Sequence, residues 1–391
     1  MIQCVIRQTV KAVAYGLSNI SDMHSNDLYE DPGSPAGRKR KEIIMEKRIG
    51  FGIVGLGSVS GTHAKALRDQ QDCYLVGGFH KNREKADQWA SENHCRAFYS
   101  LQEMLADPEI DAVSITTPSG YHLDPALAAI RAGKHVLIEK PMEITEDRIN
   151  LLIDNARAHH VLLCGIFQSR FQDAPLLLKK AVDEGRFGTI TLADAQVKWY
   201  RSQDYYDSGA WRGTWAVDGG GVLMNQGIHA IDLLLFLMGD PVEVSAHTAT
   251  LAHEKIEVED AAVAILRFGN GALGVIEGTT AAYPGSQKRI EICGSKGQAI
   301  LEEDSITKWE FAEERPEDEK IRSRFAVSTS SGGASDPGSI SQIGHTREYA
   351  DFAAAIRNGR KPFIPGEEAL RSVRLIRAIY QSAKTGAAVR F

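Results

Sequence analysis

A short apolar strand that runs into a glycine-rich turn restricts the fold of this chain more than any other feature. Residues 49–54 are apolar, Gly55-Leu56-Gly57 follows, and a helical pattern begins near Thr62. The first glycine permits the tight bend, and the second lets backbone N–H groups approach a pyrophosphate, whose charge is favoured at a helix N-terminus. The third small residue is Ser60 rather than glycine or alanine. We predict a dinucleotide site that includes Gly55, Gly57, Ser58 and Val59.

The segments after this turn alternate between strand and helix patterns. Strands are predicted at 74–79, 112–115, 135–138 and 161–165, with helices at 123–132 and 146–159. Apolar, branched strands separated by helices are typical of a parallel sheet that is covered on both faces. We predict that residues 45–166 form an α/β Rossmann domain, a doubly wound parallel sheet.

The end of the second strand carries basic residues where an NAD site usually has an acid. His80-Lys81-Asn82-Arg83 follows Phe79, and no acidic residue occurs before Glu84. An acid at this place binds the ribose hydroxyls of NAD, whereas basic side chains accept the 2′-phosphate of NADP. We predict an NAD(P) site with a preference for NADP, bordered by His80, Lys81 and Arg83. The alternative is that these charges are exposed and only begin the next helix.

Two further strand ends carry polar residues that can border the nicotinamide half of the cofactor. Thr117 and Pro118 follow strand 112–115, and His122 begins the next helix. Glu139 and Lys140 follow strand 135–138. Ligands of α/β sheets bind at these carboxyl ends, so we predict that Lys140 contacts a substrate hydroxyl. The alternatives are a helix-capping or packed ring for His122 and a solvated lysine for Lys140.

The second half of the chain has a different pattern of strands. Two strand pairs are joined by the glycine turns 269–271 and 294–297, which favours antiparallel hairpins. We predict an α+β domain over 167–391 with a largely antiparallel open sheet, which also mediates self-association into a homodimer or homotetramer. Residues 313–344 are rich in serine, glycine and charge, and we interpret them as a long loop. The expected strands are 189–200, 242–250, 261–268, 272–279, 289–293 and 298–302, and the closing helices are 347–358 and 367–383.

A glycine run in this second half precedes the most informative polar residues. Gly219-Gly220-Gly221 is followed by Asn225 and His229, which share one face if the segment is helical. Alcohol oxidation releases a hydroxyl proton, and histidine can accept a proton near neutral pH. The alternative is a core histidine that pairs with Asp232 or with the backbone.

Upstream of the glycine run, aromatic residues and arginines occur together. Aromatic faces suit the C–H faces of sugars, and arginine binds carboxylates and phosphates in a fork. An aromatic packing cluster with solvated arginines is the alternative. The predicted substrate-binding residues are Arg201, Tyr206, Trp211 and Arg212.

Composition excludes several classes of function. The net charge of −6 gives no reason to expect a nucleic acid or an anionic membrane as partner, and no apolar run approaches the roughly 20 residues of a membrane span. The five cysteines have no metal-like spacing, so we expect no metal site and a reducing, cytoplasmic location, with Cys164 a packing residue. Residues 1–44 differ in composition from the rest, and we expect a disordered leader.

Three motifs together give the chain a family resemblance. With Gly55-Leu56-Gly57, Thr117-Pro118-Ser119 and Glu139-Lys140-Pro141 in this order, the chain from Lys47 onward resembles the Gfo/Idh/MocA oxidoreductases. The resemblance implies hydride exchange between a nicotinamide and a carbohydrate-like alcohol, with Lys140 as a catalytic contact. The segment 201–232 is most similar to the branch that includes UDP-N-acetylglucosaminuronate 3-dehydrogenases.

The resemblance also bears on the pair after the glycine run. Related enzymes carry an aspartate and a histidine four residues apart, and these positions match Asn225 and His229. Asparagine cannot act as a base, so the resemblance leaves proton transfer to Lys140 and His229, and Asn225 would orient the sugar or the histidine.

The function that these observations favour is an NAD(P)-dependent dehydrogenase acting on a secondary hydroxyl of a sugar or sugar nucleotide. A UDP-linked N-acetylhexosaminuronate is one candidate substrate. A free cyclitol or glycoside dehydrogenase is the alternative within the same class. A non-catalytic NAD(P)-binding sensor is the alternative from another class, and it has no need of Lys140 and His229.

Overall fold

The structure is a computed structural model, and it describes residues 47–325 and 342–391. The expected leader at 1–44 and part of the predicted loop at 313–344 therefore lie outside the described residues, as does Cys4. Within the described ranges, no helix combines the length and the hydropathy needed to cross a membrane.

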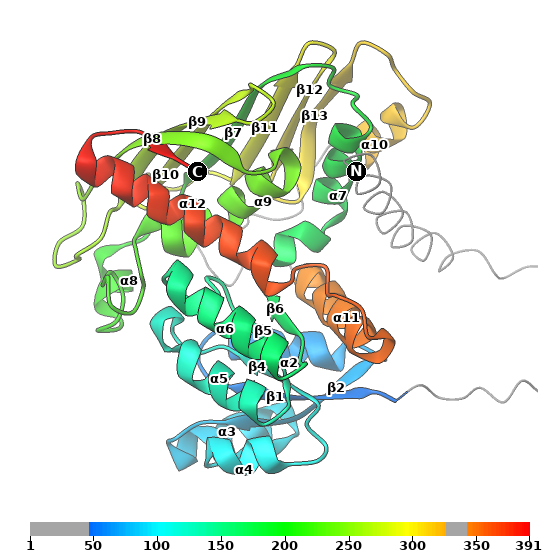
Figure 1. Cartoon of the computed structure of the whole chain (residues 1–391), viewed down its shortest axis with the longest axis vertical. Helices are drawn as coiled ribbons and strands as arrows, with labels where there is room; N and C mark the ends of the chain where they lie inside the picture. The colour runs from blue at the N-terminus through cyan, green and yellow to red at the C-terminus, as the bar shows by residue number, and fades with distance from the viewer. Residues whose placement is uncertain (1–46, 326–341) are drawn as a thin grey trace, which may run out of the picture. The chain divides into compact units, whose positions relative to one another are not determined.

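The first sheet is parallel throughout and has the strand order β3-β2-β1-β4-β5-β6 (Figure 1). The direction of strand order reverses between β1 and β4, and ligands of such sheets bind beyond the carboxyl ends of the strands at this point. The predicted Rossmann sheet is confirmed. Its strands are β1 (Ile49–Val54), β2 (Cys73–Phe79), β3 (Arg96–Phe98), β4 (Ala112–Ile115), β5 (His135–Ile138) and β6 (Leu163–Gly165). Its helices are α2 (Ser60–Arg68), α3 (Arg83–Asn93), α4 (Leu101–Ala106), η1 (Ser119–Tyr121), α5 (Leu123–Arg131) and α6 (Glu146–Ala158).

The second sheet has the order β13-β12-β11-β7-β10-β9-β8-β14, and every neighbouring pair is antiparallel except β7 and β10. The prediction of a largely antiparallel sheet is confirmed, although the hairpin turns gave no sign of the parallel pair. The strands are β7 (Ile190–Lys198), β8 (Pro241–Ala249), β9 (Ala261–Phe268), β10 (Leu273–Thr279), β11 (Arg289–Gly294), β12 (Gly297–Glu302), β13 (Ser305–Phe311) and β14 (Val389–Arg390).

In the part of the chain that the structure describes, helices cover one face of this sheet and none covers the other (Figure 1). Helices α9 (Ile228–Met238) and α12 (Gly366–Thr385) pack on it. Along β9 alternate residues are buried, whereas Val263 and Ile265 are exposed on the opposite face. The remaining helices of this half are η2 (Gln168–Phe171), α7 (Asp173–Asp183), α8 (Gln203–Asp207), η3 (Leu223–Gly227), α10 (Asp318–Phe325) and α11 (Ile343–Asn358).

The prediction that the whole of 313–344 is a loop is wrong for its first part. Helix α10 forms there because Asp318 is buried in a set of strong contacts. Its carboxylate accepts two bonds from Arg186, both 2.7 Å long, and one of 2.6 Å from the Trp309 indole. These partners are distant in sequence, so local composition could not reveal the helix.

Residues 343–364, near the end of the chain, pack against the first sheet and its helices. Helix α11 packs on α2, and the backbone of Gly165 in β6 donates to the carbonyl of Ile364 at 3.0 Å. The Arg357 guanidinium lies 2.7 Å from the Asp72 carboxylate. Residues from the far end of the sequence therefore contact the nucleotide half directly.

Candidate active site

The glycine turn between β1 and α2 has free space beside its backbone at Gly57. Gly55 has φ of 97°, and an added Cβ would lie 2.8 Å from Thr117, so only glycine fits. At Gly57 an added Cβ would meet nothing within 4 Å. Ser60 is fully buried, and its hydroxyl donates to the carbonyl of Gly57 at 2.6 Å, which fixes the turn although glycine or alanine is usual there. The turn fits a dinucleotide diphosphate.

The contrast between the two glycines gives a matched pair of variants. We expect Gly57→Ala to weaken NADH binding about 10- to 100-fold, because the methyl group occupies the space in which backbone N–H groups bond a charged diphosphate, at roughly 1.5–3 kcal/mol per bond. Its melting temperature should not change. Gly55→Ala should instead lower the melting temperature, because its φ is unfavourable for alanine. Fluorescence titration and thermal unfolding measure both, and normal NADH affinity in Gly57→Ala would place the diphosphate elsewhere.

The basic residues at the end of β2 have local contacts of their own. The His80 ring nitrogen Nδ1 accepts a bond from the backbone N–H of Asn82 at 2.9 Å. The Arg83 guanidinium lies 4.0 Å from the centre of the Tyr99 ring. Lys81 and Arg83 are exposed. These contacts leave the expected preference for NADP as a prediction.

His122 is buried between two loops at strand ends. One ring nitrogen lies 2.7 Å from the carbonyl oxygen of Thr117 and the other lies 3.0 Å from that of Pro141. Burial lowers the pKa of the ring. The side chain thus ties the segment Thr117-Pro118 to the segment after Lys140, in agreement with the packed alternative. A direct contact of His122 with a cofactor stays a prediction.

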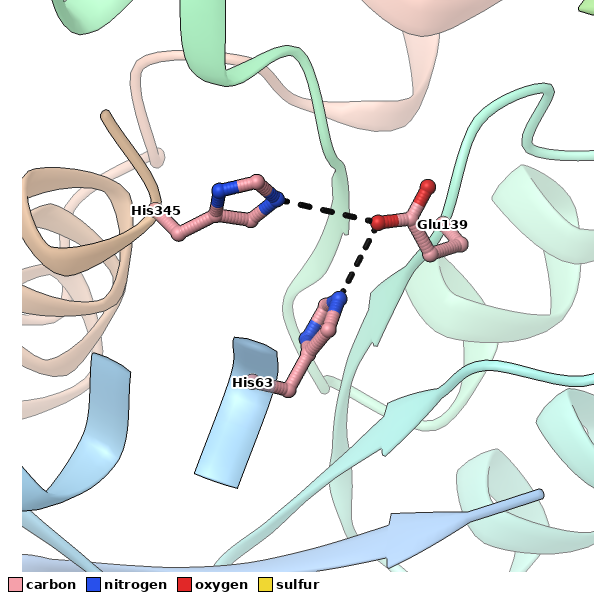
Figure 2. Close-up of side chains that lie close together, drawn as sticks. All are labelled: His63, Glu139 and His345. Atoms are coloured by element: carbon pink, nitrogen blue, oxygen red, sulfur yellow. Dashed lines mark hydrogen bonds and ion pairs between the residues drawn. The ribbon is translucent and has the colours of Figure 1, made fainter. Parts of the chain in front are cut away.

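Glu139, directly before Lys140, lies between histidines from two separate helices (Figure 2). Its Oε1 lies 3.0 Å from His63 on α2 and 3.9 Å from His345 on α11. Its Oε2 accepts the backbone N–H of Lys140 at 2.9 Å. The hydrogen bonds and positive charge of these neighbours outweigh burial and hold the pKa of Glu139 well below its usual range. The carboxylate is therefore an anion that fixes the backbone at Lys140.

His63, Glu139 and His345 are also residue types that bind metals, and their ligand atoms lie within 4.8 Å of one another. Two ligands of a tetrahedral zinc ion at about 2.1 Å would lie roughly 3.4 Å apart. The 3.0 Å between His63 and Glu139 is instead the length of a direct hydrogen bond. The other ring nitrogen of His63 lies 2.8 Å from the hydroxyl of Tyr349. Hydrogen bonding explains the contacts of His63 and Glu139 without an ion.

The Lys140 side chain crosses to the second half of the molecule. Its ammonium group donates to the backbone carbonyl of Asn225 at 3.0 Å. Asn225 lies in η3, a π-helical turn of a kind that is frequent at functional sites, and α9 follows with His229 in its first turn. The fold thus brings the side chain of Lys140 to the backbone of Asn225, whereas a joint contact of Lys140 and His229 with one substrate hydroxyl stays a prediction.

The glycine run positions this turn through Glu259. A Cβ added at Gly221 would lie 1.7 Å from the backbone oxygen of Glu259, so no larger residue fits. The Glu259 carboxylate accepts the backbone N–H groups of Gly221 and Leu223 at 2.9 and 3.0 Å. Burial raises the pKa of this carboxyl to about 7.

His229 is a buried imidazole whose Nδ1 has no hydrogen-bond partner among the described residues. The alternative pairing with Asp232 is wrong, because Asp232 is bound by the Arg170 guanidinium at 2.7 and 2.8 Å. Burial, and then the charges of Lys140 and Lys288, hold the pKa of His229 well below its usual value. The ring is neutral near pH 7 and can accept a proton.

Two charged residues near this site were not predicted from the sequence. Asp218 is buried and accepts a hydrogen bond from the side chain of Asn225 at 3.0 Å. Lys288 is buried, and its ammonium lies 3.4 Å from the Glu303 carboxylate. Asp218 directly precedes the glycine run and could have been suspected from that place. The charge of Lys288 acts on His229 because folding brings these two distant segments of the sequence near each other.

The arginine and aromatic cluster adjoins the same site. The guanidinium groups of Arg201 and Arg212 both lie over the Tyr205 ring, at 5.5 and 4.2 Å from its centre. Burial lowers the pKa of Lys140, and the charges of these two arginines lower it further. Trp211 lies 4.5 Å from Arg212. The Tyr206 hydroxyl is buried and bonded to Thr280 at 2.9 Å. Tyr205, which was not predicted, is thus the tyrosine between the arginines, and a substrate contact of Tyr206 stays a prediction.

Comparison with known proteins agrees with this geometry. Residues 49–166 match the model of the oxidoreductase family with an NAD-binding Rossmann fold, and residues 176–300 match that of the GFO/IDH/MocA C-terminal domain. A curated relative, the myo-inositol 2-dehydrogenase of Thermotoga maritima, is 30% identical over 64% of this chain and 75% of its own length.

Two solved structures are more similar in sequence. The WlbA dehydrogenase from Bordetella pertussis, in complex with NADH and UDP-GlcNAcA, is 35% identical, with a TM-score of 0.78 over 88% of this chain and 99% of that one. The WlbA dehydrogenase from Chromobacterium violaceum, in complex with the same two molecules, is 34% identical, with a TM-score of 0.79 over 89% and 97%.

Proposed function

Since the chain belongs to the GFO/IDH/MocA family of NAD-binding oxidoreductases, we propose that it oxidises a secondary ring hydroxyl of a nucleotide-linked sugar acid. The observation that carries the proposal is the hydrogen bond from the Lys140 ammonium to the backbone carbonyl of Asn225. The charge of this ammonium also acts on the buried, neutral imidazole of His229. The preferred substrate class is a UDP-linked N-acetylhexosaminuronate, as in the two WlbA complexes.

The charges around the site support an anionic substrate. Lys140, Arg201 and Arg212 affect one another electrostatically, and Lys288 acts on His229 from the second sheet. Arginine forks suit the carboxylate and the diphosphate of such a molecule. A free cyclitol is the second candidate, favoured by the likeness to a myo-inositol dehydrogenase.

The chain's residues then divide the proton chemistry between them. A bound nicotinamide supplies the hydride acceptor for the carbinol carbon. The neutral imidazole of His229 accepts the hydroxyl proton as the carbonyl group forms. The Lys140 ammonium donates a hydrogen bond to the same oxygen and stabilises the negative charge that develops there. The residues that would hold the cofactor are Gly55, Gly57, Ser58, Val59, Thr117, Pro118 and Glu139, with His80, Lys81 and Arg83 at the ribose.

Self-association and location are part of the same proposal. The open face of the second sheet exposes Leu192 and Leu273, which pair across β7 and β10, together with Val263 and Ile265. An apolar face of this kind suits a homodimer or homotetramer. The four described cysteines are free thiols, which suits a reducing cytoplasm, and Cys164 is buried as expected of a packing residue.

Two measurements test the proposed function. Mass spectrometry of the denatured protein identifies any nucleotide and sugar that remain bound after purification. Turnover with NAD and with NADP is then compared for UDP-GlcNAcA, myo-inositol and a simple glycoside. We expect the nucleotide sugar acid to have the highest kcat/KM. A higher value for myo-inositol would replace the substrate class, and a tightly bound NAD would overturn the expected preference for NADP at Lys81 and Arg83.

A further inference from the structure

The site contains the carboxylate of Asp218, which was not predicted from the sequence as a site residue. Asn225 lies four residues before His229, where the family resemblance implies an aspartate. Its side-chain amide donates to Asp218 Oδ1 at 3.0 Å, and its backbone carbonyl accepts from the Lys140 ammonium, also at 3.0 Å. Asn225 therefore connects a buried carboxylate to the catalytic lysine.

We infer that Asp218 is a positioning residue of this enzyme, which supplies through Asn225 the negative charge that the asparagine itself lacks. The inference rests on the proposed function of the site. Because Asp218 Oδ1 accepts a hydrogen bond from Asn225 Nδ2, the amide of Asn225 is held in one orientation, and its Oδ1 can accept a hydrogen bond from another group. The Asp218 carboxylate and the Asn225 amide together replace the function of a single aspartate at position 225.

Burial strengthens the field of the Asp218 carboxylate but also raises the pKa of this carboxyl, a shift that the hydrogen bonds from Gly213 and Asn225 oppose. The residue is 3% exposed, and besides Asn225 it is bonded by the backbone N–H of Gly213 at 2.8 Å. Inside a protein the field of a charge is screened far less than in water. Asp218 and Glu139 accordingly raise the pKa of Lys140 against the lowering effect of burial. The charged and titratable groups around Lys140 are Glu139 on its own loop, Asp218, Arg201 and Arg212 on the segments before η3, and His229 on α9.

Asp218→Asn is the first test, because the asparagine retains an oxygen for Gly213 and loses only the charge. The missing anion lowers the pKa of Lys140, so the limb of the kcat/KM pH profile that belongs to Lys140 should move to lower pH by about one unit. The amide of Asn225 should also reverse toward its new neighbour. We expect kcat to fall roughly tenfold or more while KM for NAD stays the same.

The exchange of the two groups is the sharper test. In Asp218→Asn/Asn225→Asp, the carboxylate moves to position 225 and the amide to position 218, so the same hydrogen bond forms in the opposite direction. We expect this double variant to recover most of the lost kcat and the original pH limb. Asn225→Asp alone places two carboxylates in contact, which forces them to share a proton, and its activity should fall as pH rises through that pKa.

The outcomes separate a positioning role from a structural one. If Asp218 only anchors the loop at Gly213, Asp218→Asn keeps kcat and the pH limb, and the inference is overturned. If the double variant is no better than Asp218→Asn, it is overturned as well. If the wild-type protein turns over no sugar, the proposed function fails first. The pKa of Lys140 is then measured by NMR after ¹³C reductive methylation, with the signal assigned by its loss in Lys140→Arg, and an unchanged pKa in Asp218→Asn would still refute the inference.

Discussion

Replacement of Lys140 by alanine should lower kcat by about 10²- to 10⁴-fold, the range found when a positioned acid–base or electrostatic group is removed. The ammonium group joins the nucleotide half to the Asn225 carbonyl at 3.0 Å. Without it the negative oxygen that develops in the transition state loses this positive charge. The affinity for NADH should stay within about threefold, because the diphosphate turn is formed by other residues.

Lys140→Arg and His229→Gln are the controls for this prediction. Arginine keeps the positive charge but cannot occupy the space of a compact ammonium, so we expect it to restore little activity. Glutamine at 229 keeps a polar side chain and removes the base, so kcat should fall while NADH binding is retained. Single-turnover rates at saturating NAD measure the effect. Full activity in Lys140→Ala would remove this lysine from the chemistry.

Replacement of Arg170 by methionine should destabilise the fold by about 3–5 kcal/mol, the usual cost of leaving one member of a buried ion pair without its partner. Arg170 is 2% exposed and Asp232 is 1% exposed. Asp232 lies on α9, three residues after His229, so this pair also anchors the helix of the candidate base. Urea denaturation of the variant and the wild type gives the difference in the free energy of unfolding.

A second substitution tests the physical reason. Arg170→Met/Asp232→Leu removes both charges, and we expect it to recover most of the lost stability because an apolar pair leaves no buried charge unpaired. Arg371→Ala is the matched control. Glu368 pairs with Arg170 at 3.0 Å and with Arg371 at 2.8 Å. The Arg371 side chain is 18% exposed against 2% for Arg170, so we expect its removal to cost less than the removal of Arg170. Equal losses for Arg170→Met and Arg371→Ala would show that burial is not the cause.

Local patterns were sufficient for much of the secondary structure of the first half, although β3 and α4 were not predicted. Strands β1, β4 and β5 have the bounds that the sequence predicts, because each is a short apolar run between turn-forming residues. Helix α10 was missed because the Asp318 contacts that stabilise it come from Arg186 and Trp309, which are remote in sequence. Local composition carries no record of such partners.

The sequence by itself determined the glycine turn and the alternation of strands and helices, since each depends on neighbouring residues along the chain. It also identified Lys140 and His229 as candidate site residues. Only the tertiary structure decided that Asp218 faces Asn225, that Asp232 belongs to Arg170, and that His345 from the far end of the chain lies beside Glu139. These contacts join segments that are adjacent only after folding. A buried charge is stable only with its partners around it, and which partners it has is a property of the packed molecule.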